Sequence, residues 1–360
     1  MVSRSETRPV QVGNVTVGGG APVSVQTMLN ADPHDVSALL AQLRESAECG
    51  AELIRLTVPD QEAARVFGEV RKLSPVPLIA DIHFDFRLAL VAIEAGADAL
   101  RINPGNIGGA DRVRQVVMAA QKKRVPIRIG VNGGSLEKDI FARYGSATPE
   151  ALVESVARHV ALLEAQDFHD IVISAKASDV PRTIAVYRLL AERFPYPLHL
   201  GVTEAGTFLP GTVRSCVALG VLLSEGIGDT IRVSLTDRPV QEVRVGIELL
   251  RAAGLRAPGA SVTSCPTCGR TQVDVAGVAE GIQTRLEKFY REHPDAPRPH
   301  IAVMGCVVNG PGEAKNADLA VAGGKDCWAL YVRGNWVRNI PADAAIETIC
   351  SMVESGCAGS

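Results

Sequence analysis

Residues 77–103 read PLIADIHFDFRLALVAIEAGADALRIN, which is two short apolar runs separated by a segment rich in Leu and Ala. The runs 77–82 and 98–103 have the length of buried strands, whereas 85–95 has the apolar spacing of a helix. The helical segment is followed by Gly96, a residue favoured just after a helix C-terminus. The stretch therefore predicts a strand, a helix and a second strand in the order of a parallel βαβ unit.

The same alternation recurs through the first two thirds of the chain. The strand candidates are 23–28, 52–57, 77–82, 98–103, 127–132, 171–176, 198–204 and 230–236. Helix candidates between them include 36–49, 85–95, 110–123, 149–166, 179–193 and 210–223. Eight strands alternating with helices over about 250 residues predict a (β/α)8 TIM barrel. The alternative is an open doubly wound sheet, but that fold usually carries a GxGxxG turn after its first strand, and this sequence has none.

The remaining third of the chain has a different pattern. A short hairpin is predicted at 10–17, before the barrel, and a Gly- and Pro-rich linker at 252–262, after it. The elements expected beyond the linker are a helix at 276–292, strands at 299–304, 318–322, 328–333 and 335–340, and a helix at 342–354. We therefore predict an α/β protein, with a barrel domain over 1–255 followed by a smaller α+β domain over 262–360.

Composition limits the classes of partner. The chain has 360 residues, 46% hydrophobic and 21% charged, with a formal net charge of −3. That balance argues against a nucleic-acid-binding protein held by bulk electrostatics. The start of the chain has no apolar signal core, and no apolar run approaches the length of a membrane span. We expect a cytoplasmic protein, in a compartment that keeps its eight cysteines reduced.

Polar residues gather at the ends of the predicted barrel strands. A TIM barrel carries its active site at the C-terminal ends of its strands, so these residues are expected to meet at one mouth. They are Arg55, Asp81, His83, Arg101, Asn103, Arg128, Asn132, Lys176, His199, Glu204, Arg232 and Ser234. Five are cations and only two are carboxylates, so the mouth predicts a ligand with more than one negative charge. Phosphate or diphosphate fits, because guanidinium groups match phosphate oxygens in pairs.

Three of these residues have alternative roles. Glu204 can be a structural partner of the cations or a protonated acid that donates to a substrate, and the sequence leaves both open. For His83 and His199 we favour hydrogen bonding that orients a substrate.

The α+β domain carries a set of thiols. Residues 265–270 read CPTCGR and residues 304–313 read MGCVVNGPGE, which places Cys265, Cys268 and Cys306 among turn residues. Thiolates select zinc, copper or iron–sulfur clusters. Three thiolates and one unusual ligand, for which Glu313 is the candidate, fit a cluster with one exchangeable iron. The alternative is a structural zinc site with Cys327 as fourth ligand.

With both halves considered, the sequence resembles the bacterial 4-hydroxy-3-methylbut-2-enyl diphosphate synthase family of the methylerythritol phosphate isoprenoid pathway. The motifs that carry the resemblance are VSVQTM, IRLTVPD, ADIHFD, LRINPGN, IRIGVNGGS, ISAKASD, HLGVTEAG, CPTCGR and MGCVVNGPGEA. They span nearly the whole chain in order, and the length matches the compact two-domain bacterial form.

The resemblance implies an activity and a cofactor. The reaction is the reductive ring opening and dehydration of 2-C-methyl-D-erythritol 2,4-cyclodiphosphate, with electrons from flavodoxin or ferredoxin. It implies a 4Fe–4S cluster on Cys265, Cys268 and Cys306, with Glu313 as displaceable ligand and Asn309 beside the substrate. It also implies a homodimer in which the cluster domain of one chain covers the barrel mouth of the other. The alternative function is a phosphosugar lyase or hydrolase on the same barrel, with a zinc ribbon used only for assembly.

Overall fold

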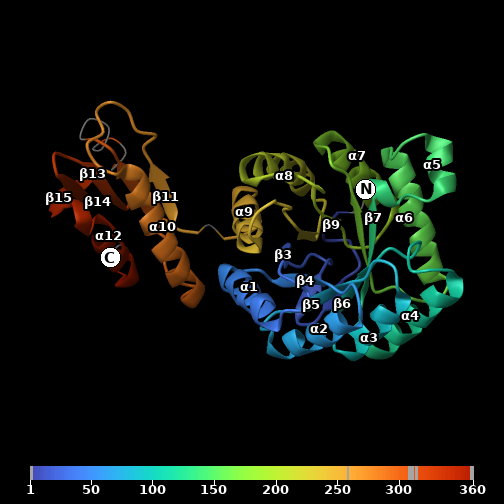
Figure 1. The fold of residues 1–360 in the computed structure, drawn as a ribbon. Helices are drawn as coiled ribbons and strands as arrows, with labels where there is room; N and C mark the ends of the chain where they lie inside the picture. The colour runs from blue at the N-terminus through green and yellow to red at the C-terminus, as the bar shows by residue number, and fades with distance from the viewer. Residues whose placement is uncertain (1–2, 258, 307–311, 313–314, 357–360) are drawn as a thin grey trace. The chain divides into compact units, whose positions relative to one another are not determined.

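The chain forms two compact units, Met1–Arg256 and Ala257–Ser360 (Figure 1). The computed structural model describes residues 3–257, 259–306, 312 and 315–356. Asn309 and Glu313 lie outside the described residues.

The first unit is a TIM barrel, as predicted. Its eight parallel strands are β3 (Ser24–Met28), β4 (Leu53–Thr57), β5 (Leu78–Asp81), β6 (Ala99–Ile102), β7 (Ile127–Asn132), β8 (Ile171–Lys176), β9 (His199–Leu200) and β10 (Thr230–Ile231). They pair in chain order, β10 returns to β3, and a parallel bridge between Ile173 and Leu198 closes the ring. Every predicted strand is present, but β9 and β10 are much shorter than the predicted 198–204 and 230–236.

Helices surround the barrel, as Figure 1 shows. They are α1 (Val36–Cys49), α2 (Gln61–Leu73), α3 (Phe86–Glu94), α4 (Ala110–Lys123), α5 (Lys138–Tyr144), α6 (Pro149–Glu164), α7 (Val180–Arg193), α8 (Phe208–Ser224) and α9 (Pro239–Ala252). A 3-10 turn, η1 (Gly133–Ser135), precedes α5. Local chemistry sets several boundaries: Asp35 accepts a hydrogen bond from the Ala38 N–H at the start of α1, and Gly50 ends that helix with φ +108°.

A hairpin closes the bottom of the barrel. Strands β1 (Val10–Val12) and β2 (Val15–Val17) are antiparallel, as predicted for 10–17. Val12 and Val17 pack on Leu53, Ile79 and Ala99, which lie at the N-terminal ends of β4, β5 and β6. With this end covered by apolar side chains, the C-terminal ends of the strands form the open mouth.

The second unit is an α+β domain with a five-stranded sheet. Its strands, in sheet order, are β11 (Ser261–Ser264), β12 (His300–Met304), β13 (Leu319–Gly323), β14 (Cys327–Val332) and β15 (Asn335–Pro341). Strands β11, β12 and β13 are parallel to one another. Strand β14 is antiparallel to β13, and β15 is antiparallel to β14. Strand β11 was not predicted, because its exposed Ser and Thr residues do not read as a buried strand.

Two helices form the apolar core of this domain with the sheet. They are α10 (Val275–Glu292) and α12 (Ala345–Glu354), and the second follows a 3-10 turn, η2 (Ala342–Ala344). Ile282 and Leu286 of α10 pack with Val303, Trp328 and Ile349. None of the helices within the described ranges is long and apolar enough to cross a bilayer.

Candidate functional site

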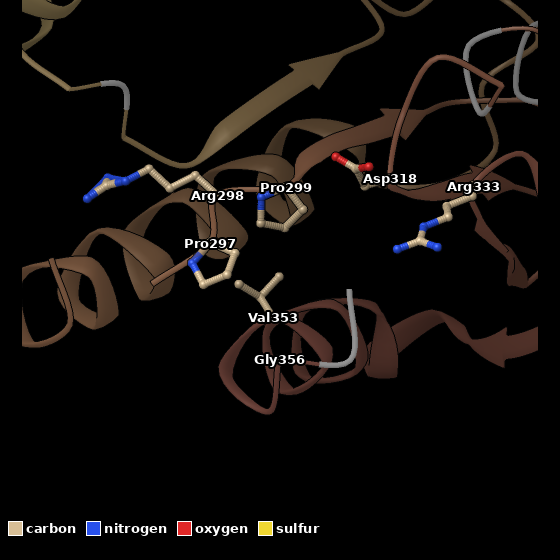
Figure 2. A pocket seen from close by; sticks show the side chains of 7 residues that line it. All are labelled: Pro297, Arg298, Pro299, Asp318, Arg333, Val353 and Gly356. Atoms are coloured by element: carbon tan, nitrogen blue, oxygen red, sulfur yellow. The ribbon is translucent and has the colours of Figure 1, made fainter. Parts of the chain in front are cut away.

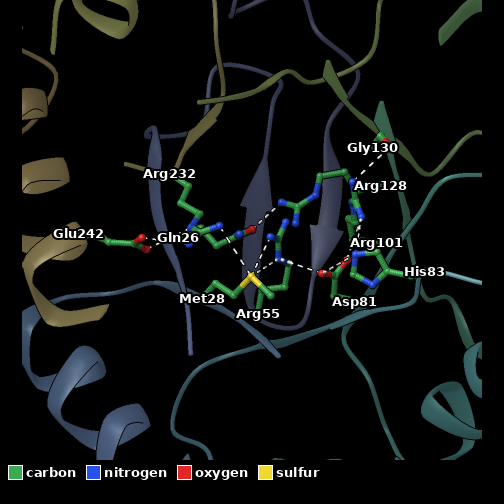
Figure 3. A network of polar contacts seen from close by, with 10 residues as sticks. All are labelled: Gln26, Met28, Arg55, Asp81, His83, Arg101, Arg128, Gly130, Arg232 and Glu242. Carbon is green, nitrogen blue, oxygen red and sulfur yellow. Dashed lines mark hydrogen bonds and ion pairs between the residues drawn. The ribbon is translucent and has the colours of Figure 1, made fainter. Parts of the chain in front are cut away.

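The barrel mouth holds a polar pocket at the C-terminal ends of the strands (Figure 3). Nine predicted residues line it: Arg55, Asp81, His83, Arg101, Arg128, Asn132, Lys176, Arg232 and Ser234. Met28, Ser174 and Thr203 line it as well and were not predicted. The strand register explains the clustering, since Arg101 lies directly opposite Asp81 on one side and Arg128 on the other.

Asp81 is the carboxylate at one side of the pocket. Its Oδ1 lies 3.2 Å from Arg101 Nη1, and its Oδ2 lies 3.7 Å from Arg55 Nε. Burial raises the pKa of the Asp81 carboxyl, but the charges of Arg55 and Arg101 outweigh burial, so the pKa lies below its ordinary value. Asp81 is therefore an anion that holds two guanidinium groups rather than a proton donor.

Glu242 of α9 is the second buried carboxylate, and it pairs with Arg232. It accepts hydrogen bonds from Arg232 Nη2 at 2.9 Å and Nε at 3.1 Å, and from the Thr27 hydroxyl at 2.8 Å. Only 2% of Glu242 is exposed. This bidentate contact fixes the Arg232 guanidinium at the wall of the mouth.

Within the described ranges, neither Arg128 nor Lys176 forms an ion pair with a carboxylate. Arg128 donates from Nη1 to Gln26 Oε1 at 2.5 Å, and its Nε and Nη2 are buried without a hydrogen-bond partner among the described residues. Burial and the neighbouring arginines hold the pKa of the Lys176 ammonium well below its usual value. Both groups are therefore cations in need of a counter-charge, which an anionic ligand would supply.

Two glycines make room for these side chains. A Cβ added at Gly130 would lie 2.2 Å from Arg101 Nε, and one at Gly201 would lie 2.6 Å from Lys176 Nζ. A larger residue at either position would displace a mouth cation. The close approach of these two cations therefore explains why glycine is required in IRIGVN and in HLGVTE.

Three predicted residues are not among the lining residues. Asn103 is buried after β6 and accepts a hydrogen bond from the Gly105 N–H at 3.1 Å. His199 is fully buried in β9, and burial together with Arg128 and Lys176 lowers the pKa of its imidazole well below the usual value. Glu204 is exposed, has φ +53°, and directly follows the lining residue Thr203.

Besides Ser174 and Thr203, the prediction missed Gln26, Met28 and Glu242. Gln26 and Met28 belong to VSVQTM, where two polar or polarizable residues at alternating positions of the first strand were a usable signal. Glu242 has a weaker signal, an acidic residue on the apolar face of α9. Nothing in the sequence places that helix residue against Arg232, because the contact depends on the barrel geometry.

The predicted thiols lie at one edge of the second unit. Cys265 follows β11 and its N–H donates to the Val303 carbonyl of β12 at 3.0 Å, while Cys306 follows β12 by two residues. The Cys268 N–H donates a hydrogen bond to Thr271 Oγ1 at 3.2 Å. Thr271 packs closely on Gly305, since a Cβ added at Gly305 would lie 2.8 Å from Thr271 Oγ1. The two thiol-bearing loops are therefore packed together.

The thiols of Cys265, Cys268 and Cys306 are suitable ligands for a metal centre. The Thr267 N–H donates to Cys265 Sγ at 3.4 Å. Within the described ranges no three His, Cys, Asp or Glu side chains already converge on one metal position. Cys327 begins β14 at this same edge, because β14 runs antiparallel to β13. The position of Cys327 therefore leaves the zinc alternative open.

A second pocket lies elsewhere in the α+β unit, and Figure 2 shows its lining. Arg298 stacks over the Tyr290 ring at 4.6 Å, and the Asp318 carboxylate accepts the His300 N–H at 2.8 Å. Among the described residues that line this pocket, Arg298 and Asp318 already have partners in the fold, and Arg333 is exposed. We assign this pocket no chemistry.

The fold and site define a TIM-barrel protein with a cationic mouth, joined to an α+β unit that carries three thiols on loops that pack together. Residues 7–247 match the GcpE TIM-barrel domain, and residues 261–355 match the GcpE protein C-terminal domain. The chain belongs to the GcpE family.

Relatives with a described activity are similar over nearly the full chain. The 4-hydroxy-3-methylbut-2-en-1-yl diphosphate synthase (flavodoxin) of Geobacter sulfurreducens is 52% identical, over 98% of this chain and 98% of its own. The enzyme of the same name from Symbiobacterium thermophilum is 52% identical, over 98% of this chain and 94% of its own. The one from Ruminiclostridium cellulolyticum is 49% identical, over 97% of both chains.

Proposed function

We propose that this protein is an oxidoreductase that converts 2-C-methyl-D-erythritol 2,4-cyclodiphosphate to 4-hydroxy-3-methylbut-2-enyl diphosphate. The balanced reaction takes up two electrons and two protons, opens the ring and releases one water. Family membership and the names of the relatives support this activity. The observation in the structure that carries it is the excess of buried cations over carboxylates at the barrel mouth.

The mouth residues bind and orient the diphosphate. Arg55, Arg101, Arg128, Lys176 and Arg232 supply positive charge to its oxygens, and Asp81 and Glu242 keep the arginines in place. A bound anion would also return the pKa of Lys176 toward its usual value. Asn103, Asn132, Ser234, His83, His199 and Asn309 are the proposed orienting residues.

The proposed cofactor is a 4Fe–4S cluster held by Cys265, Cys268, Cys306 and Glu313. Such a cluster would supply the two electrons one at a time. Glu204 is the proposed proton donor, because it directly follows a lining residue of the pocket and its carboxyl is exposed to proton exchange with solvent. A flavodoxin is the proposed electron donor, as the names of the relatives indicate. We further propose that the protein is cytoplasmic and that it forms a homodimer. Sedimentation of the purified protein would test the dimer.

Anaerobic purification followed by metal analysis tests this proposal. The expected result is an iron-containing brown protein that turns over the cyclic diphosphate with reduced flavodoxin. Serine variants of Cys265, Cys268 and Cys306 should each lose iron, whereas Cys327→Ser should retain it. A colourless protein with stoichiometric zinc, and zinc loss in Cys327→Ser, would instead support the phosphosugar lyase or hydrolase with a structural zinc ribbon.

The role proposed for Glu313 has its own test. Glu313→Ala should leave the barrel folded and able to bind inorganic pyrophosphate, but should impair turnover. Unchanged turnover in this variant would remove Glu313 from the mechanism.

A further inference from the structure

Met28 lies at the centre of the polar network in the barrel mouth, as Figure 3 shows. It is the last residue of β3 and is paired in register with Arg55 of β4. Its Sδ accepts from Arg55 Nη2 at 2.8 Å and from Arg55 Nε at 3.2 Å. Arg232 Nη1 lies 3.7 Å from the same sulfur. One thioether thus contacts two like-charged guanidinium groups.

Arg55 differs from Arg232 and Arg101 in what it contacts. Arg232 has a bidentate carboxylate in Glu242, and Arg101 has Asp81 at 3.2 Å. Arg55 Nε lies 3.7 Å from Asp81 Oδ2, whereas Arg55 Nη2 lies 2.8 Å from the Met28 sulfur. The closest described acceptor of Arg55 is therefore a weak one, because thioether sulfur accepts hydrogen bonds poorly.

A weak acceptor at this position has a specific consequence. Without the sulfur, Arg55 could move the short distance to Asp81, where it would compete with Arg101 and be less available to a ligand. A strong acceptor such as a carboxylate would occupy Arg55 permanently. A thioether holds the guanidinium in place and gives it up readily to a phosphate oxygen, which makes a far stronger charge-assisted hydrogen bond.

We propose that Met28 is a positioning residue, whose sulfur holds the Arg55 guanidinium in the mouth and yields it to an oxygen of the ligand's diphosphate. The assignment rests on the proposed function for the identity of the diphosphate. Met28 itself makes no charged contact with the ligand, so its effect acts through Arg55.

The test replaces Met28 by Leu, which keeps a similar apolar volume and removes the acceptor. Met118→Leu is the matched control, since Met118 is an exposed residue of α4 outside the mouth. Two quantities are measured on the full-length, cluster-loaded enzyme: KM and kcat for the cyclic diphosphate, and the Kd of inorganic pyrophosphate by calorimetry. Met28→Leu should raise both KM and Kd by about three- to tenfold, with kcat within about twofold of the wild type. Met118→Leu should change none of the three.

A double-mutant cycle separates this role from simple packing. In an Arg55→Lys background, Met28→Leu should have no further effect on the pyrophosphate Kd, because the planar group that the sulfur holds is gone. An equal effect in both backgrounds, or an unchanged Kd in folded Met28→Leu protein, would overturn the proposal. Pyrophosphate binding does not depend on turnover. If the wild type binds pyrophosphate but does not convert the cyclic diphosphate, the proposed function fails while the role of Met28 is still tested.

Discussion

Asp81 Oδ1 lies 3.2 Å from Arg101 Nη1, and the two residues are directly opposite each other on neighbouring strands β5 and β6. Only 1% of the Asp81 side chain and 11% of the Arg101 side chain are exposed. Removing one member of so buried a pair leaves the other charge in a medium that solvates it poorly. The pair therefore links the stability of the barrel to the charge of its mouth.

Asp81→Asn should destabilise the protein strongly. The amide retains the shape but not the charge, and both Arg101 and Arg55 lose their nearest carboxylate. We expect a loss of about 3–5 kcal/mol in the free energy of unfolding, measured by urea denaturation. Glu62→Gln is the control, because Glu62 forms an exposed ion pair with Arg65, and it should cost less than about 1 kcal/mol. Equal stability of the two variants would show that Asp81 does not hold the mouth together.

Glu242→Gln should make the protein depend on its ligand for stability. Gln can still accept the Thr27 hydroxyl, but Arg232 is left without a counter-charge. We expect a loss of about 2–4 kcal/mol without ligand, and a larger rise in Tm on adding pyrophosphate than the wild type shows, because the anion replaces the missing charge. Glu248→Gln, on the exposed face of the same helix, should behave as the wild type does. A smaller ligand-induced rise in Tm for Glu242→Gln would contradict this account.

Lys176→Met should stabilise the protein while impairing binding. The fold lowers the pKa of Lys176, so between that pKa and the usual value the unfolded chain binds more protons than the native state. The buried ammonium therefore costs stability at neutral pH, and this cost falls as the pH rises.

We expect Lys176→Met to gain about 1–3 kcal/mol in the free energy of unfolding at pH 7, with the gain shrinking at higher pH. Its Kd for pyrophosphate should rise at least about tenfold. Lys72→Met, at an exposed position of α2, should change neither quantity. A destabilised Lys176→Met protein would mean that the ammonium already has a compensating partner in the fold.

The sequence was sufficient to predict where the barrel strands begin. Strand periodicity is local, and buried parallel strands are continuous apolar runs, so β4 to β8 start within one residue of their predicted positions. The ends of β9 and β10 were predicted less well. Directly after β9, a Cβ added at Gly201 would lie 2.6 Å from Lys176 Nζ and 2.9 Å from the Arg232 carbonyl oxygen, and this close packing is a tertiary contact that local periodicity does not reveal.

The charges of the mouth were predictable for a related reason. A charged residue inside an apolar strand is rare enough to be informative, and every predicted barrel strand except 23–28 supplied at least one. What surrounds those charges was not predictable. Glu242 reaches Arg232 from helix α9, which the sequence does not place against the mouth. Met28 can be recognised as a partner of Arg55 only when the pairing of β3 with β4 is known. The sequence thus predicts which charges meet, but not which side chains hold them apart.

Asp229, at the bottom of the barrel, should give the stability a measurable pH dependence. It lies before β10, and its carboxylate accepts the Leu198 N–H at 2.8 Å and the Thr7 hydroxyl at 2.9 Å. Burial raises the pKa of this carboxyl to about 6, although these hydrogen bonds favour the charged form. Since the unfolded pKa is about 3.9, the native state binds more protons than the unfolded chain between roughly pH 4 and 6. The stabilisation from the protonated acid is therefore complete below about pH 4 and is lost as the pH rises through 6.

The Asp229→Asn variant isolates this contribution, because its amide does not titrate. The free energy of unfolding of the wild type, minus that of Asp229→Asn, should fall by about 2–3 kcal/mol between pH 4 and pH 7 and stay constant above. Urea denaturation of both proteins at half-unit pH steps measures the difference, and the exposed Asp343→Asn serves as the control. A difference that instead rises with pH would mean that the hydrogen bonds from Leu198 and Thr7 outweigh burial, and that Asp229 is held in the fold as an anion.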